Sequence, residues 1–207
     1  MPPEPTLYVV DDDEAVRDSL EILLQSAGYT VRSFAAGQDF LDATTTISPG
    51  CLIVDIRMPG MDGFELQRRL GQRQSAISVI VITGHGDIPM AVRAMRAGAV
   101  DFVEKPFSED AILESVRLAL ARLAEPRSGV QSDPATMARL GNLSPREREV
   151  LEGLVAGLPN KTIAYDLKIS PRTVEIHRAR VMDKMQARSL SELVRLALSA
   201  GIDPQSG

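Results

Sequence analysis

The chain has 207 residues, of which 44% are hydrophobic, and a formal net charge of −5. This length is sufficient for two domains with separate cores. Its single cysteine, Cys51, excludes an intrachain disulfide, and we expect it to pack as a small apolar side chain. No apolar run approaches the ~18 residues that cross a bilayer, and the first residues lack the features of a secretion signal. We therefore expect a cytoplasmic protein with two domains and no membrane partner.

Short apolar runs alternate with helical segments through the first 124 residues. This alternation predicts an α/β fold, a doubly wound (βα)5 flavodoxin-like domain with a parallel sheet. The expected strands are 6–10, 30–34, 51–55, 79–83 and 101–104, and the expected helices are 14–27, 37–44, 62–72, 88–97 and 108–123.

Four of these strands end on residues suited to holding a phosphoryl group and its metal ion. The first runs into Asp11 and Asp12, the third into Asp55, the fourth into Thr83 and the last into Lys105. In a flavodoxin-like sheet the first and third strands are neighbours, so the three carboxylates should meet at one edge. Hard oxygen ligands favour Mg²⁺, and we expect Asp12 and Asp55 to bind it directly and Asp11 to act through water.

Asp55 is the candidate phosphoacceptor. Its carboxylate can attack a phosphoryl group whose charge the metal ion partly neutralises. Lys105 can pair with the incoming phosphate, and the Thr83 hydroxyl can donate a hydrogen bond to it. Asp13 precedes an amphipathic helix, and we expect it to cap that helix.

Segments 10–13, 55–63, 83–86 and 105–107, which read VDDD, DIRMPGMDG, TGHG and KPF, carry a resemblance to receiver domains of two-component response regulators. The resemblance spans residues 6–123. It implies that a sensor histidine kinase phosphorylates Asp55, that the backbone carbonyl of Arg57 joins the Mg²⁺ ligands, and that the Lys105–Pro106 peptide is cis. Phe102 resembles the aromatic residue that turns inward when Thr83 moves, although it could equally be ordinary core.

The same resemblance implies that the phosphorylated receiver pairs through its fourth helix and the elements beside it. Helices that simply cover the sheet would show the same apolar pattern, so this alternative stays open. The surface comprises Ile88, Val92, Met95, Asp101 and the helix at 108–123.

An aspartyl-phosphate hydrolase is a second use for Asp55 and Mg²⁺. Such enzymes usually carry a second carboxylate two residues after the nucleophile, where this chain has Arg57. We therefore expect a phosphoacceptor protein and no enzyme.

A polar segment rich in helix breakers separates the two halves of the chain. We place a receiver domain at 1–124, a linker at 125–142, in which Thr136–Leu140 could form a short helix, and a second domain at 143–207. The formal charge is −7 over residues 1–124 and +2 over residues 125–207, and the segment from Arg172 to Arg188 holds five bases and two acids. Such a basic segment is suited to nucleic acid.

Residues 143–200 predict four short helices. Ser144 and Glu147 match a capping box, and Ser189 and Glu192 repeat it. Helix 160–167, a tight turn and helix 171–185 predict a helix-turn-helix, whose second helix enters the DNA major groove. Three residues of that second helix share one face and should be core, namely Val174, Val181 and Met185.

Segments 143–150, 160–164 and 170–177 resemble the LuxR/FixJ-type helix-turn-helix. The resemblance implies contacts to DNA phosphates and to base edges. Glu175 could accept from a cytosine amine or form an internal salt bridge, and Ile176 could meet a thymine methyl. The phosphate contacts would be Lys161, Thr173, His177 and Lys184, and the residues that face bases would be Arg172, Glu175, Ile176 and Ala179. Arg180 lies on the same exposed face and is a further candidate for DNA binding.

The two modules together imply a phosphorylation-activated transcriptional regulator that binds paired promoter half-sites as a homodimer. The last helix, 189–200, would close the small core, add a second dimer contact, or both. We expect the unphosphorylated receiver to mask or misplace the recognition helix, and phosphorylation to shift this equilibrium toward a dimer. An alternative is a phospho-dependent scaffold whose helical domain binds protein.

Within this class the chain most resembles FixJ-type regulators. The likeness implies a FixL-like, oxygen-responsive kinase as partner, nitrogen-fixation or microaerobic genes as targets, and RNA polymerase as a further partner.

Overall fold

The structure, a computed structural model, describes residues 5–43, 48–73, 75–84, 88–124 and 133–202. Contacts between residues divide the chain into two compact units, residues 1–86 with 97–126 and residues 87–96 with 127–207. The expected linker residues 125–132 lie outside the described part of the chain.

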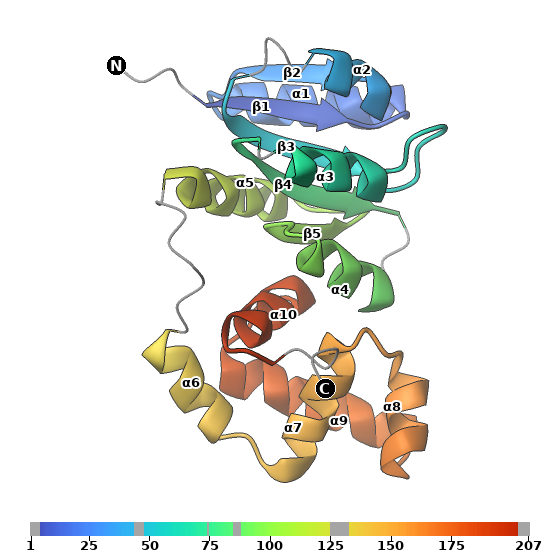
Figure 1. The fold of residues 1–207 in the computed structure, drawn as a ribbon, viewed down its shortest axis with the longest axis vertical. Coiled ribbons are helices and arrows are strands. Elements are labelled where there is room, and N and C mark those ends of the chain that lie inside the picture. Colours follow the sequence, from blue (N-terminus) through green and yellow to red (C-terminus); the bar gives the residue numbers. More distant parts are fainter. Residues whose placement is uncertain (1–4, 44–47, 74, 85–87, 125–132, 203–207) are drawn as a thin grey trace. The chain divides into compact units, whose positions relative to one another are not determined.

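A five-stranded parallel sheet forms the centre of the first unit (Figure 1). The strand order is β2-β1-β3-β4-β5, the flavodoxin-like order expected from the sequence. Val10 of β1 is paired with Val54 of β3, so the residues that follow these strands emerge side by side. The strands are β1 (Thr6–Val10), β2 (Val31–Phe34), β3 (Gly50–Asp55), β4 (Ile77–Thr83) and β5 (Asp101–Glu104).

Helices alternate with these strands, and every predicted boundary in this half agrees with the structure within two residues. Asp13 caps the first helix as expected, because its carboxylate accepts a hydrogen bond from the Ala15 amide at 2.9 Å. By its contacts α4 is grouped with the second unit. The helices are α1 (Glu14–Ser26), α2 (Gly37–Asp42), α3 (Gly63–Gln72), α4 (Ile88–Arg96) and α5 (Glu109–Ala124).

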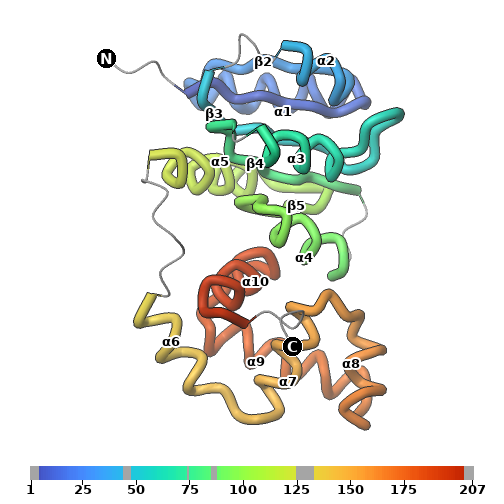
Figure 2. The backbone as a smooth tube through the Cα atoms, viewed as in Figure 1, coloured from blue at the N-terminus to red at the C-terminus, as the bar shows by residue number. Residues whose placement is uncertain are grey.

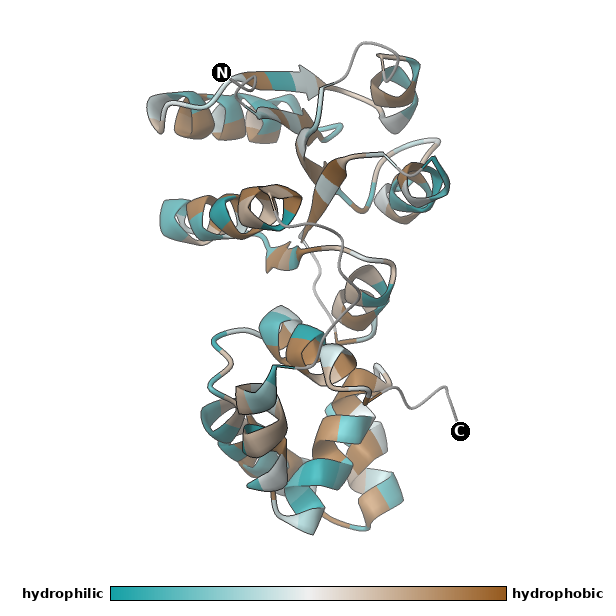
Figure 3. Cartoon of the chain, turned by 60° about the vertical axis from the view of Figure 1, so that its left-hand side comes forward, coloured by the Kyte–Doolittle hydropathy of each residue, from teal (hydrophilic) through white to brown (hydrophobic). Residues whose placement is uncertain are grey.

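The central strands are covered on both faces, which explains why they read as continuous apolar runs (Figure 3). Helices α1 and α5 cover one face. Leu20 and Leu24 of α1 and Ile112 and Val116 of α5 are fully buried in one cluster with β1, β3 and β4. Full burial of an aliphatic side chain of this size contributes roughly 1.5–3 kcal/mol, so this packing fixes the strand ends that carry the site.

The carboxy-terminal part of the second unit is helical throughout its described elements, and Figure 2 follows its backbone from α6 to α10. The predicted helix, turn and helix have the bounds that the structure gives to α8 and α9. Helix α6, which we expected inside the linker, sends Leu140 into the core of this part, where 4% of the residue remains exposed. The helices are α6 (Pro134–Gly141), α7 (Pro145–Val155), α8 (Asn160–Leu167), α9 (Pro171–Met185) and α10 (Leu190–Ser199).

Two capping boxes were predicted, and the structure contains one of them complete. The Ser144 hydroxyl accepts from the Glu147 amide, and the Glu147 carboxylate accepts from the Ser144 amide. At α10, Ser189 accepts from the Glu192 amide at 3.1 Å, but the Glu192 carboxylate accepts from the amide of Arg188. The second prediction is therefore wrong in its return bond.

Within the described ranges, no helix combines the length and the apolar character needed to cross a membrane.

Candidate phosphoryl site and nucleic-acid interface

Three residues at the carboxyl edge of the sheet are buried although their side chains are polar. Asp11 follows β1, Asp55 ends β3 and Thr83 ends β4, and they are 1%, 5% and 1% exposed. Buried carboxylates are costly unless cations or hydrogen bonds compensate their charge. The edge therefore needs a cation.

Lys105, which follows β5, supplies that cation within the chain. Its Nζ atom lies 2.6 Å from Asp11 Oδ2 and 2.8 Å from Asp55 Oδ1. Its backbone amide donates to the Thr83 carbonyl at 2.7 Å, which ties the ends of β4 and β5 together. The Lys105–Pro106 peptide is cis, as the resemblance implied. One ammonium group thus joins two carboxylates that come from strands far apart in the sequence.

The acid–base properties of Asp11 and Lys105 reflect this arrangement. Burial raises the pKa of Asp11 above its usual value, against the opposing effect of Lys105. Burial alone would lower the pKa of Lys105, but the hydrogen bonds to Asp11 and Asp55 outweigh it, and the net shift of its pKa is upward. Lys105 therefore stays charged at neutral pH.

Backbone amides hold the two carboxylates in place. The Arg57 amide donates to Asp55 Oδ2 at 2.5 Å, and the Asp13 amide donates to Asp11 Oδ1 at 3.0 Å. Both oxygens of Asp55 thus accept one hydrogen bond, and each keeps lone-pair capacity for a further partner. The hydrogen bonds therefore orient the Asp55 side chain and leave its oxygens able to accept another partner.

Gly63 packs against the backbone of Asp55 and Ile56. A Cβ atom at this position would lie 2.4 Å from the Asp55 carbonyl oxygen and 3.0 Å from the Ile56 Cα atom. The Gly63 amide donates to the Ile56 carbonyl at 3.0 Å. The start of α3 can approach the Asp55 segment this closely only because residue 63 has no side chain.

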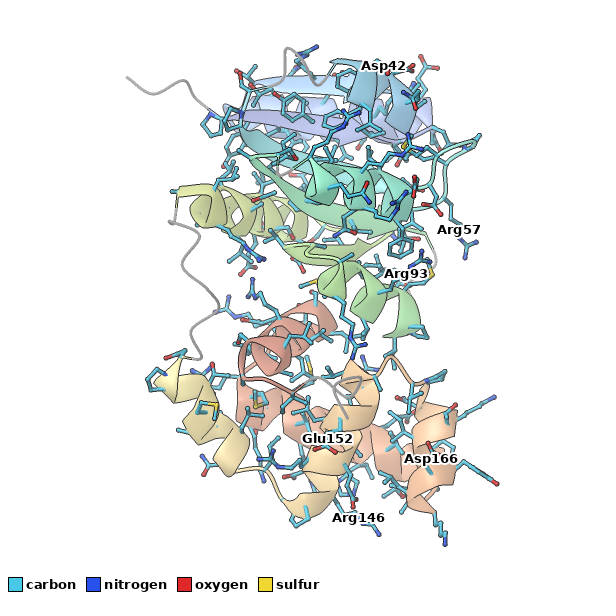
Figure 4. All side chains as sticks on the ribbon, viewed as in Figure 1. Asp42, Arg57, Arg93, Arg146, Glu152 and Asp166 are labelled. Carbon is cyan, nitrogen blue, oxygen red and sulfur yellow. The ribbon has the colours of Figure 1, made fainter. Side chains whose placement is uncertain are left out.

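The structure does not gather every residue predicted for this site. Asp12 is exposed, and the described residues contain no group of three Asp, Glu, His or Cys side chains close enough to hold a metal ion. The Arg57 side chain points into solvent (Figure 4). Its backbone carbonyl is the part of this residue that the resemblance implies as a Mg²⁺ ligand. Phe102 is half-buried. The oxygen donors that the structure does place together are those of Asp11 and Asp55, and hard carboxylate oxygens of this kind fit Mg²⁺.

The expected pairing surface presents little free apolar area in this structure. Val92 and Met95 of α4 are 3% and 6% exposed, and Ile88 is half-buried. Asp101 of β5 is engaged internally, because its Oδ2 atom accepts from the Ser115 hydroxyl at 2.6 Å.

Helix α9 has one buried and one exposed face, as predicted. Val174, Val181 and Met185 are fully buried. Ile176 is 47% exposed, an apolar side chain in solvent on an otherwise polar face. The Glu175 side chain makes no hydrogen bond or ion pair within the part of the chain that the structure describes, so the internal salt bridge considered for it is not formed there. The other exposed members of the predicted DNA surface are Lys161, Arg172, Ala179, Arg180 and Lys184.

Three predicted phosphate contacts already have partners or burial in the protein. The Thr173 hydroxyl lies 2.8 Å from the Ser170 hydroxyl, and the Nδ1 atom of half-buried His177 is buried. The Lys184 ammonium is 2.7 Å from Glu147 Oε2. These three side chains are therefore less available to DNA than Lys161 or Arg172.

Tyr165 was missed by the sequence reasoning. It is 84% exposed on α8, one turn after Lys161, while Ile163 and Ala164 of the same helix are buried. The helical spacing of the buried pair could have revealed it, because position 165 lies opposite them. An aromatic side chain so exposed on a helix-turn-helix is a candidate contact residue.

Comparison with known proteins agrees with the two-part architecture. Residues 7–117 match the response regulator receiver domain, and residues 141–197 match the bacterial regulatory proteins of the luxR family. The transcriptional regulatory protein FixJ of Bradyrhizobium diazoefficiens is 55% identical over 199 residues, which cover 95% of this chain and 96% of the relative. FixJ of Rhizobium meliloti is 52% identical over 96% of this chain and 98% of the relative.

A solved structure extends the likeness to three dimensions. Full-length FixJ from B. japonicum aligns with 51% identity and a TM-score of 0.56, and the alignment covers 96% of this chain and 98% of that one. The chain therefore belongs to the response regulators that join a receiver domain to a LuxR-type DNA-binding domain, and it is FixJ-like.

Proposed function

We propose that Asp55 accepts a phosphoryl group from a cognate, FixL-like sensor histidine kinase, and that the phosphorylated chain pairs and binds two promoter half-sites through α9. The observation that carries this proposal is the ammonium of Lys105 shared between buried Asp11 and Asp55 at the carboxyl edge of the sheet. A site that has already gathered a nucleophilic carboxylate and a cation can neutralise a phosphoryl group.

Phosphoryl transfer to Asp55 forms one bond and breaks another. A carboxylate oxygen of Asp55 attacks the phosphorus of a phosphohistidine, the new oxygen–phosphorus bond forms, and the nitrogen–phosphorus bond breaks with its electron pair returning to the imidazole. Lys105 can remain paired with the growing negative charge. The Arg57 amide, which already donates to Asp55 Oδ2, keeps the carboxylate in its attacking orientation.

Mg²⁺ is the cofactor that these residues would hold, in keeping with receiver domains generally. Its ligands would come from Asp55, the Arg57 backbone carbonyl and the acidic pair Asp11 and Asp12. Bound there, the ion would neutralise the phosphoryl oxygens during transfer. Lys105 contacts one oxygen of each buried carboxylate, and the carboxylate oxygens keep lone-pair capacity for a metal ion.

Phosphorylation changes the charge to which Lys105 and Thr83 respond. A phosphoryl group adds acceptor oxygens and about one unit of negative charge to Asp55, and both side chains would follow it. Phe102 is half-buried beside these strand ends and would turn into the space that Thr83 leaves. The altered surface of α4 and β5, with Ile88, Val92, Met95 and Asp101, would then form the dimer contact.

The helix α9 would read the major groove in each half-site. Arg172 and Arg180 are exposed and have no ion-pair partner among the described residues, so both are available to base edges or phosphates. Ile176 would contact a thymine methyl. Following the FixJ relatives, the regulated genes would be nitrogen-fixation or microaerobic genes, with RNA polymerase as the next partner.

Replacement of Asp55 by Asn tests the proposal. Asn keeps the shape of the side chain but is a poor nucleophile, so phosphate uptake from acetyl phosphate or a kinase should be lost. The mass in solution and the affinity for a promoter duplex should then no longer respond to the donor. Exposed Asp110 on α5 provides a control, since Asp110→Asn should accept phosphate normally.

Transfer to the Asp55→Asn chain at the normal rate would contradict the assignment of the phosphoacceptor. Salt-dependent binding of the unmodified chain to a selected duplex, measured separately, tests the DNA-binding role.

A further inference from the structure

One buried carboxylate links the first helix of the DNA-binding core to the recognition helix. Glu147, near the start of α7, is 4% exposed, and its Oε2 atom accepts from the Ser144 amide at 2.8 Å and from Lys184 Nζ at 2.7 Å. Lys184 Nζ also donates to the Asn142 carbonyl at 3.2 Å. The last turn of α9 is thus bonded to the start of α7 and to Asn142 ahead of that helix, which lie more than 35 residues earlier in the sequence.

The cost of burying the Glu147 carboxylate explains why the ion pair with Lys184 should be persistent. An unpaired buried carboxylate is strongly destabilising, whereas a paired and hydrogen-bonded one is tolerated. The hydrogen bond from Lys184, followed by the bond from the Ser144 backbone, lowers the pKa of Glu147 to about 2. Glu147 is therefore charged near neutral pH, and movement of Lys184 away from it would leave a buried carboxylate without its cation.

The position of Lys184 along α9 gives the contact a mechanical effect. Arg172, in the first turn of α9, is twelve residues away, which corresponds to about 18 Å along a helix. A rotation of about 5° at the Lys184 end would move the Arg172 end by roughly 1.5 Å over that length. Val181 and Met185 pack this end of the helix into the core, and Val174 packs the other end, so the ion pair adds a polar restraint to that apolar packing.

We propose that Glu147 and Lys184 form a positioning pair that sets the orientation of the recognition helix, and that Lys184 is not a phosphate contact. The inference rests on DNA binding by α9 as proposed above. It replaces the role that the sequence resemblance gave to Lys184, and it assigns to Glu147 a function in binding although this residue cannot touch DNA from the core.

The two roles predict different salt dependences. Each phosphate neutralised by a lysine contributes about 0.9 to the slope of the logarithm of affinity against the logarithm of salt concentration. Removing a phosphate contact therefore lowers both the affinity and the slope. Removing a positioning residue lowers the affinity and leaves the slope unchanged.

The experiment uses the full-length chain, activated with acetyl phosphate, and a duplex obtained by binding-site selection. The variants are Glu147→Gln, Lys184→Met and the double variant, each measured at several salt concentrations. We expect each single variant to lose about tenfold in affinity, the double variant to lose no more than either single one because they share one interaction, and every slope to match the unaltered chain. Lys184→Arg, which preserves the pair, should restore most of the affinity.

The opposite pattern would overturn the proposal. If Lys184→Met lowers the slope by about 0.9 while Glu147→Gln binds as well as the unaltered chain, Lys184 is a phosphate contact. Unchanged affinity in both variants also rejects the pair as a positioning device. Circular dichroism identifies variants that fail to fold, and Glu147→Gln, which can keep its capping bond, is the variant expected to remain folded.

Two further variants separate this inference from the proposed function. Glu149→Gln breaks the exposed ion pair with Arg146 on the same helix, 2.8 Å long, and should not affect DNA affinity. Arg172→Ala should weaken specific binding if α9 reads DNA. If Arg172→Ala has no effect, the proposed function of α9 fails, whatever the behaviour of Glu147 and Lys184.

Discussion

The candidate phosphoryl site and the candidate DNA surface organise charge in opposite ways. At the carboxyl edge of the sheet, two carboxylates are buried and share one ammonium group. On α8 and α9, Lys161, Arg172 and Arg180 are exposed and have no ion-pair partner among the described residues. The first site has a counter-charge from the protein itself, whereas the exposed bases of the second have none among the described residues and would pair with charges on another molecule.

This difference has consequences for mutation. Groups in the buried site depend on each other, so removing one leaves another uncompensated, and the effects should be large and non-additive. Exposed basic side chains act almost independently on the free protein, so their removal should cost DNA affinity without costing stability.

Lys105→Ala should destabilise the receiver more than any surface substitution. It leaves Asp11 and Asp55 buried without their cation, and we expect a loss of about 3 kcal/mol in the free energy of unfolding at pH 7. The loss should shrink on acidification, because burial raises the pKa of Asp11 and its protonation removes one of the two uncompensated charges. Urea unfolding followed by circular dichroism at pH 7 and pH 5 measures both effects.

Millimolar Mg²⁺ should restore part of the stability of the Lys105→Ala chain, since the ion can replace the missing ammonium. A variant that is as stable as the unaltered chain at neutral pH would show that the two carboxylates do not depend on Lys105.

Leu140→Ala tests whether α6 belongs to the DNA-binding core. Leu140 is 4% exposed in that core, so its truncation should cost about 2–3 kcal/mol in the unfolding of this part of the chain. Met137 on the same helix is 49% exposed, and Met137→Ala should cost less than about 0.5 kcal/mol. Thermal unfolding of the two variants compares them directly, and equal effects would place α6 outside the core.

Gly63→Ala tests how tightly α3 packs against the Asp55 segment. The added Cβ atom would lie 2.4 Å from the Asp55 carbonyl oxygen, and relieving this clash should cost about 1–3 kcal/mol and slow phosphate uptake. Gly71 lies in the same helix with no atom within 4 Å of an added Cβ, so Gly71→Ala should be neutral or stabilising. Denaturant unfolding and acetyl-phosphate labelling of both variants provide the comparison.

The stability of the DNA-binding part should depend on pH through Glu147. Its folded-state pKa is about 2, below the ordinary value of 4.5, so its stabilising contribution is complete above pH 4.5 and is lost as the pH falls toward 2. The difference in melting temperature between the unaltered chain and Glu147→Gln should therefore be largest near neutral pH and should narrow below pH 4. A difference that is constant from pH 7 to pH 3 would contradict this linkage.

Most of the fold could be predicted from local patterns. Fully covered parallel strands read as short apolar runs, and turn and capping residues such as Asp13 and Ser144 mark the helix starts. The position of Asp11 beside Asp55 followed from the strand order alone. The burial of Val174 and Val181 followed from helical spacing.

The pairings between side chains were less predictable. Lys184 was expected at DNA, but the sequence does not reveal that α7 places Glu147 within 2.7 Å of it. Leu140 was assigned to a linker because flanking turn residues outweighed a short helical pattern. Asp12 was expected to bind Mg²⁺ directly; its side chain is exposed, because adjacent residues after a strand point in different directions, and its role as a metal ligand stays a prediction.

The packing of Leu140 into the helical core sets a rule for building chimeric regulators. A receiver from another protein should be joined to this output domain after Ala124 and before Asp133, so that α6 is transferred whole. A junction at Leu143 would discard α6 and with it Leu140, which packs into the core of the DNA-binding part. The resulting fusion would lose DNA binding even when its new receiver is fully functional.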